Sequence, residues 1–140
     1  TAAENVAMPL MFKGIDPDVR LLEAKKMLCR VGLKDRMDHF PNQMSGGQQQ
    51  RVGIARAFVT RPEVVFADEP TGNLDSVSSA EVLGFLKRSV NELGQTIVLV
   101  SHDPEMTEYA DRIVTLIDGR IVSNVENQVK AEIDAAPYIE

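Results

Sequence analysis

The chain has 140 residues, of which 44% are hydrophobic and 26% charged, a composition typical of one globular domain or of a piece of a larger one. Its formal net charge of -6 disfavours a broad electrostatic grip on nucleic acid. The single cysteine excludes an internal disulfide and favours a reducing compartment, and the apolar runs are far shorter than the roughly 20 residues of a membrane span.

The sequence begins at Thr1, without an initiator methionine and already inside an amphipathic pattern, so we expect a fragment of a longer chain. No secretory signal is recognisable there, and we expect any membrane association to go through a partner.

The first helix that the pattern predicts in detail covers residues 16 to 32. Asp16 is suited to cap its N-terminus, Pro17 to occupy the first helical position, and Gly32 to end it. Apolar residues recur at three- and four-residue steps, which predicts one buried stripe of Leu21, Ala24, Leu28 and Val31.

A second helix is predicted to begin at Ser45. Ser45 and Gln48 fit an S-x-x-Q capping box, in which each side chain satisfies a backbone N–H group of the other residue. Pro62 is expected to mark its end. The buried side is predicted to contain Val52, Ala55 and Val59.

Strands and a long helix follow. Residues 63–68 and 96–101 are short apolar runs, as buried parallel strands are. Between them we expect a helix from about Ser76 to Leu93, closed by Gly94. Its inward residues are predicted to be Ala80, Leu83, Leu86, Val90 and Leu93.

The end of the chain is predicted to be antiparallel. Residues 103–110 can form a brief helix, and residues 112–122 suggest a hairpin that turns at Asp118-Gly119. A weak terminal helix is suggested by the spacing of Val125, Val129 and Ile133. Together the elements indicate an α/β fold, with one plausible division between a helical part, residues 1–62, and an α/β part, residues 63–140.

Ser45-Gly46-Gly47-Gln48 is the first candidate for chemistry, because it stands at the start of a predicted helix. Backbone N–H groups lack partners there, and the helix dipole favours negative charge. The glycines leave room for close approach and the serine hydroxyl can donate, so the stretch could clamp a phosphate group. A serine-capped helix behind a tight loop explains the same residues, and taken alone the motif favours that second interpretation.

Two further candidates follow the predicted strands. Asp68 and Glu69 end the first strand, where parallel sheets usually bind ligands; Asp68 could help hold Mg²⁺ beside a nucleotide, and Glu69 could orient or deprotonate a water. His102 follows the second strand and could donate to a terminal phosphate from the same edge. An acidic turn stopped by Pro70 and an ordinary polar histidine are the alternatives. His39, in a loop without catalytic company, is interpreted as structural.

In this order, the segments resemble the second half of an ATP-binding-cassette (ABC) ATPase, from Thr1 to about Val122. "MSGGQ" resembles the family's signature motif with Met44 in place of leucine, "VVFADEP" the Walker B strand, and "GNLD" the D-loop. The resemblance implies a P-loop NTPase-like fold with ATP and Mg²⁺ as ligands. It also implies site residues, namely Glu69 and His102 in catalysis, Asp68 as a Mg²⁺ ligand acting through water, and Asp75 at a dimer interface.

The segments "TAAENVAMPL" and "DEPTGNLDS" are similar to transporter subunits that serve lipoprotein release and macrolide export. Such ATPases pair head to tail, which implies a second ATPase subunit and transmembrane permease subunits as partners, no nucleic acid, and a cytoplasmic position at the inner face of the cell membrane. It further implies that the nucleotide of the opposing subunit contacts Ser45, Gly46, Gly47 and Gln48.

A P-loop needs G-x-x-x-x-G-K-[ST], and no glycine in these 140 residues is followed by lysine. We therefore expect the parent protein to hydrolyse ATP and this chain alone to be inactive. We also expect apolar strand surface to be open to water and to promote self-association. The alternatives are a non-catalytic binding module derived from a cassette half and a nucleic-acid-associated ABC ATPase.

Overall fold

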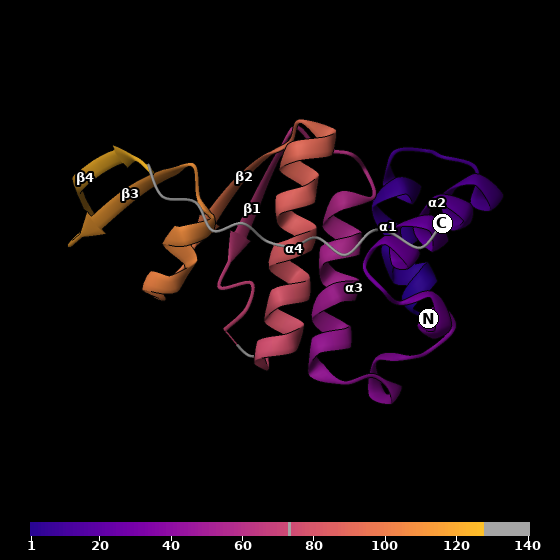
Figure 1. The fold of residues 1–140 in the computed structure, drawn as a ribbon. Coiled ribbons are helices and arrows are strands. Elements are labelled where there is room, and N and C mark those ends of the chain that lie inside the picture. The colour runs from indigo at the N-terminus through magenta and orange to yellow at the C-terminus, as the bar shows by residue number, and fades with distance from the viewer. Residues whose placement is uncertain (73, 128–140) are drawn as a thin grey trace.

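A computed structural model describes residues 1–72 and 74–127, which form helices first and strands later (Figure 1). None of the helices in these residues is both long and apolar enough to cross a membrane. The α-helices are α1 (Ala2–Phe12), α2 (Pro17–Arg30), α3 (Gly46–Phe58) and α4 (Ser76–Leu93). The strands are β1 (Val64–Asp68), β2 (Thr96–Val100), β3 (Arg112–Ile117) and β4 (Arg120–Glu126), and the short 3-10 helices are η1 (Lys34–Arg36), η2 (Pro41–Gln43) and η3 (Pro104–Tyr109).

Helix α2 forms where the sequence predicts it. The Asp16 side chain accepts hydrogen bonds from two backbone N–H groups of the first turn, and Gly32 follows the helix with a φ of 71°. Ala24, Leu28 and Val31 are buried and Leu21 is partly buried, as predicted. Together with α1 they make the helical part of the core.

Helix α3 also begins as predicted, with Ser45 as its N-cap. It ends at Phe58, four residues before Pro62. The predicted side is buried, and Phe58, which the sequence analysis did not single out, is buried with it. Its ring meets the Phe85 ring of α4 edge to face, with 5.0 Å between the ring centres. One continuous core therefore joins α3 to α4 and β1.

Strands β1 and β2 are parallel, with Val64 opposite Thr96. Helix α4 covers one face of this pair, lying between it and α3 (Figure 1). On that face Val65 is buried, but Phe66 on the other face is 77% exposed. The prediction of two buried strands is thus wrong for one face, because no described element covers it. The exposed face contains Val64, Phe66, Val98 and Val100.

Helix α4 has the predicted bounds, and Gly94 ends it in the left-handed conformation at a φ of 64°. Its buried face is only partly the predicted one, since Ala80 and Leu93 are exposed. The helix packs against both the sheet and α3, so its buried stripe is wider and rotated relative to the prediction. The buried residues are Val82, Leu83, Gly84, Phe85, Leu86 and Ser89.

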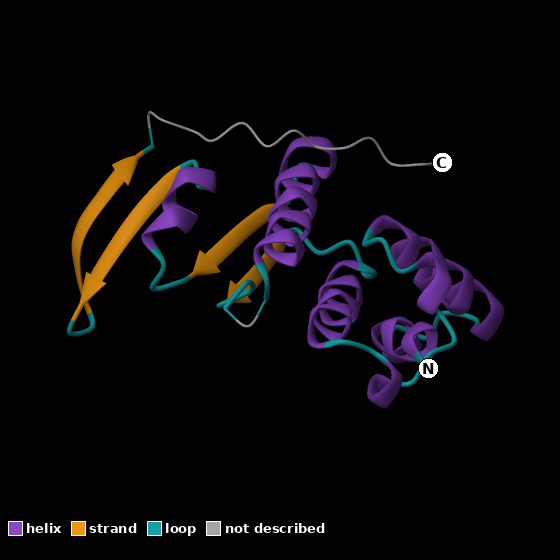
Figure 2. Cartoon of the chain, turned by 60° about the horizontal axis from the view of Figure 1, so that its bottom comes forward, coloured by secondary structure: helices purple, strands orange, loops and turns teal. Residues whose placement is uncertain are grey.

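Strands β3 and β4 form the predicted hairpin, with both Asp118 and Gly119 at positive φ, as a two-residue turn of this kind requires. The hairpin stands apart from the helices α1 to α4 in both views, with the short helix η3 beside it (Figures 1 and 2). Val125 lies in β4, which overturns its assignment to a terminal helix, because β4 continues the pairing with β3 to Glu126. Val129 and Ile133 lie outside the described residues.

Candidate functional site

The parallel pairing of β1 and β2 brings two predicted site segments to one edge of the sheet. The Glu69 backbone N–H donates to the Val100 carbonyl at 2.9 Å, which extends the pairing one residue beyond Asp68. Ser101 and His102 follow immediately on the neighbouring strand. Glu69 and His102 are 33 positions apart in the sequence but adjacent in the structure.

The Glu69 carboxylate accepts three hydrogen bonds from these neighbours. The His102 backbone N–H lies 2.9 Å from Oε1, the His102 ring Nδ1 lies 2.6 Å from the same oxygen, and the Ser101 hydroxyl donates to Oε2 at 3.0 Å. The His102 side-chain bond is the main cause that lowers the pKa of Glu69, and the same bond raises the pKa of His102. Both shifts favour a carboxylate facing an imidazolium.

Ser101 is a site residue for which the sequence analysis assigned no function. Its position directly before His102 is the only signal that could have singled it out. Besides donating to Glu69, its hydroxyl accepts the backbone N–H of Asp103 at 3.2 Å. Ser101 therefore holds two groups in place: the Glu69 carboxylate and the backbone of the turn that follows β2.

The backbone of Glu69 is itself unusual, with a φ of 44° in the left-handed region that residues with side chains rarely adopt. The turn after it is closed by backbone bonds from Gly72 to Glu69 and from Leu74 to Thr71. Such strained positions persist where the surrounding structure determines them, and they gather at functional sites. The conformation directs the Glu69 side chain to Ser101 and His102.

An open cleft of about 590 Å³ lies at this sheet edge. Glu69, Ser101 and His102 line one part of it, and residues of the turn after Glu69, of α4, and of η3 with its N-cap line the rest. The His102 side chain is 89% exposed and the Glu69 side chain 37% exposed, so a ligand in the cleft can reach both. The cleft is the place where these two side chains could act on a bound molecule.

Asp68 lies at the end of β1, on the exposed face of the sheet, and its side chain has no hydrogen bond among those found in the described residues. These residues contain no group of three or more side chains that could hold a metal ion. Mg²⁺ is usually bound by only one or two carboxylates together with substrate phosphates. Asp68 does not line the cleft, but a single exposed carboxylate at the end of β1 fits that mode of binding.

The Ser45 corner has the predicted capping box. The Gln48 backbone N–H donates to the Ser45 hydroxyl oxygen at 3.3 Å, and the Ser45 backbone N–H donates to the Gln48 side chain at 3.0 Å. A Cβ added at Gly46 would meet nothing within 4 Å, whereas one at Gly47 would lie 3.1 Å from the Ser78 hydroxyl. Gly46 is therefore open to a ligand, and Gly47 permits the close approach of α4.

Asp75 caps α4. One carboxylate oxygen accepts the Ser78 backbone N–H and the other accepts the Ser78 hydroxyl, both at 2.9 Å. These bonds lower the pKa of Asp75, the backbone bond contributing most. Helix capping thus accounts for Asp75 within the chain. In the Gly-Asn-Leu-Asp motif of residues 72–75, residue 73 lies outside the described residues.

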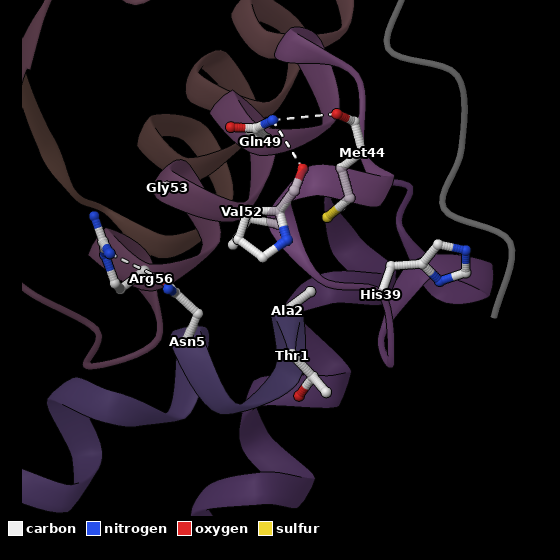
Figure 3. A pocket seen from close by; sticks show the side chains of 10 residues that line it. Thr1, Ala2, Asn5, His39, Met44, Gln49, Val52, Gly53 and Arg56 are labelled. Carbon is white, nitrogen blue, oxygen red and sulfur yellow. Dashed lines mark hydrogen bonds between the residues drawn. The ribbon is translucent and has the colours of Figure 1, made fainter.

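No hydrogen bond found among the described residues joins Ser45, Gly46, Gly47 or Gln48 to Glu69 or His102, and none of the four lines the cleft. A second, smaller cavity of about 160 Å³ lies between the start of α1 and α3, where Gln49 donates to two carbonyls and Arg56 to Asn5 (Figure 3). His39 also lines it, but its ring points away from Val52 in this view. The candidate residues thus form two separate groups.

A glycine-rich capped helix, and a strand ending in two acids beside a histidine, agree in this α/β fold with an ATP-binding-cassette protein. The chain belongs to the ABC transporter family, whose sequence profile matches residues 1–72. An uncharacterized ABC transporter ATP-binding protein of Methanocaldococcus jannaschii is 54% identical over 87% of this chain. The macrolide export ATP-binding/permease protein MacB of Pasteurella multocida is 49% identical over 89% of it.

The fold agrees with solved cassettes. A dimeric ATP-binding cassette in a post-hydrolysis state, bound to ADP and Pi, matches 90% of this chain with a TM-score of 0.80 and 40% identity. The family resemblance and the fold class predicted from the sequence are therefore confirmed. The chain covers 56% of that cassette, 54% of the Methanocaldococcus protein and 19% of the Pasteurella protein, so it spans only part of each.

Proposed function

We propose that the full-length protein hydrolyses ATP to power a membrane permease, as an ATPase subunit bound peripherally at the cytoplasmic face of the membrane. The contact between Glu69 and His102 at the open cleft carries this proposal, because it pairs a candidate base with a candidate hydrogen-bond donor to the terminal phosphate. The permease is supported by relatives named as ATP-binding/permease proteins.

In this proposal Glu69 and His102 act on the chain's own nucleotide. Glu69, held ionised by its three donors, orients the attacking water and accepts its proton. When the His102 ring donates through Nδ1 to Glu69, its Nε2 remains available to an oxygen of the terminal phosphate. Asp68 would hold Mg²⁺ through water, and the ion would supply positive charge to the phosphates.

The other group would serve a partner. Ser45, Gly46, Gly47 and Gln48 would contact the nucleotide of a second ATPase subunit in a head-to-tail dimer, with Asp75 near the interface. The open space at Gly46 and the unpaired N–H groups of a helix start support this role, as does the dimeric state of the similar cassettes. Residues 1–62 and 63–140 would then be the signature-bearing and Walker B parts of the cassette.

The decisive experiment replaces Glu69 by Gln in the full-length gene product. We expect ATP binding to be retained and magnesium-dependent turnover to fall at least about 100-fold, because the amide cannot accept the proton. Glu63→Gln, an exposed position just before β1, is the matched control and should leave turnover unchanged. Turnover close to wild type in Glu69→Gln would show that another group is the base.

The 140-residue chain by itself is expected to be inactive, since it contains no P-loop sequence to hold the phosphates. Magnesium-dependent ATP turnover by the purified chain, lost in Glu69→Gln, would contradict this.

A further inference from the structure

The two groups of site residues are separate, but three contacts join the elements that carry them. The start of α3 meets the segment from Pro70 to Glu81 through Gln50, Gly47 and Arg51. This segment follows Glu69 directly and includes the Asp75 cap of α4.

The first contact comes from Gln50, two residues after Gln48. Its side-chain amide donates to the Pro70 carbonyl at 3.2 Å. Pro70 is buried and follows Glu69, whose backbone is in the left-handed conformation. A hydrogen bond at this carbonyl therefore supports the strained turn from the side of α3.

The second contact is the close approach at Gly47. A Cβ there would lie 3.1 Å from the Ser78 hydroxyl, which itself donates to Asp75. A side chain at this position would require Ser78, whose hydroxyl is bonded to the Asp75 cap, to shift by a few tenths of an ångström.

The third contact is an ion pair between Arg51 and Glu81. Arg51 Nη1 lies 2.7 Å from a Glu81 carboxylate oxygen, and the Arg51 side chain is only 17% exposed. Its buried Nε has no hydrogen-bond partner among the described residues, so the guanidinium depends on Glu81 to compensate for its loss of hydration. Because the Arg51 side chain is mostly buried while Glu81 is about half exposed, this ion pair constrains the helices more than a fully exposed one does.

We propose that Arg51, through Glu81, is a positioning residue that couples the two half-sites of one chain. The proposal rests on the proposed function. With the helix start held rigidly to the Glu69 turn, engagement of the partner's nucleotide at Ser45-Gly46-Gly47 is transmitted to the base that acts on the chain's own nucleotide. The consequence is cooperativity between the two ATP molecules of a dimer.

The test is a charge exchange in the full-length gene product, comparing Arg51→Glu, Glu81→Arg and the double exchange. For each single variant we expect kcat to fall about tenfold with KM changed by less than about twofold, because positioning rather than binding is lost. The Hill coefficient for ATP should fall toward 1. The double variant should recover most of kcat and the cooperativity.

The matched control exchanges Lys26 and Glu23, which form an ion pair of the same length, 2.7 Å, on α2 away from both groups. It should leave kcat and the Hill coefficient unchanged. If Arg51→Glu does not fold, Glu81→Gln decides, since Glu81 is about half exposed and its loss should be tolerated.

Folded Arg51 or Glu81 variants with wild-type kcat and Hill coefficient would overturn the coupling, as would a folded double variant without recovery. These outcomes are distinct from failure of the proposed function, in which the wild-type protein would not hydrolyse ATP or Glu69→Gln would remain active. Hydrogen exchange adds a measurement that does not depend on turnover: in the Arg51 variants, residues 46–50 and residues 71, 72, 74 and 75 should exchange faster together.

Discussion

Neighbouring residues form hydrogen bonds with both the backbone and the side chain of Glu69. Its φ of 44° points the carboxylate across the sheet edge, where Ser101 and His102 supply the hydrogen bonds that keep it ionised. The Nδ1 contact also gives the His102 ring a preferred orientation, with Nε2 on the far side of the ring from Glu69. In the proposed function, this one contact prepares Glu69 to accept a proton and His102 to donate a hydrogen bond.

The first prediction at this scale concerns the pKa of His102. Because the bond to Glu69 favours the imidazolium, its pKa should lie above the ordinary 6.5, and Glu69→Gln should return it toward that value. An NMR titration of the ring protons of the metal-free protein measures both. A midpoint unchanged by Glu69→Gln would contradict the contact.

The pH dependence of stability follows with a definite sign. The pKa of Glu69 is lowered from 4.5 and that of His102 raised from 6.5, so the pair's contribution to stability is complete between these two values. It is lost as the pH falls through the folded pKa of Glu69 or rises through the folded pKa of His102. The effect should be small, because the His102 side chain is 89% exposed to screening solvent.

At the scale of elements, α3 and α4 begin side by side and each begins at a capping side chain. Ser45 caps α3 and Asp75 caps α4, with Gly47 and Ser78 between them. Capping alone would account for the serine, as it does for Asp16 on α2. A variant of Ser45 that keeps the cap and adds a negative charge separates helix capping from phosphate binding.

We therefore predict that two replacements of Ser45 differ in their effect on stability. Ser45→Ala removes the cap and should lower the free energy of unfolding by about 1 kcal/mol, whereas Ser45→Asp keeps a good cap and should leave it near wild type. Both should reduce ATP turnover by the full-length protein, because the first loses the donor and the second repels phosphate. Urea melts and turnover assays measure the two effects.

Asp16→Ala is the control for this experiment. It removes the cap of α2, away from both groups of site residues, and should lower stability without changing turnover below the melting transition. Wild-type turnover in Ser45→Asp would mean that Ser45 only caps the helix.

At the scale of the whole molecule, the described residues leave two apolar surfaces uncovered. One is the outer face of β1 and β2, and the other is the β3–β4 hairpin, whose Leu116 and Ile121 are more than half exposed. Both stand away from the helical side of the molecule (Figure 2). An exposed apolar strand pair of this kind promotes association of chains.

We predict that the purified 140-residue chain self-associates and that Phe66→Asp weakens this association. Phe66 is 77% exposed at the centre of the outer sheet face, so a charge there should oppose burial of that face. Phe12→Asp is the control, because Phe12 is 79% exposed at the end of α1, away from the sheet. Light scattering that shows a monodisperse monomer of the unchanged chain would contradict the prediction.

Features that depend on a few neighbouring residues, such as helix ends and tight turns, could be predicted from the sequence. Caps and left-handed glycines act within a few residues, so Asp16, Ser45 and Gly94 marked helix ends that the structure confirms. The Asp118-Gly119 turn was predictable for the same reason. The ordered set of motifs also sufficed to indicate the family, and the family profile and the solved cassettes confirm it.

Burial and the contacts between distant residues depend on how the elements pack and could not be predicted from local patterns. The burial of β1 and α4 was partly mispredicted because it depends on which neighbours cover each face, and an apolar run does not state this. The register of Val64 with Thr96 brings Glu69 to His102, and the packing of α3 on α4 brings Arg51 to Glu81. Such distances are set by the packing of whole elements, which no local pattern of residues encodes.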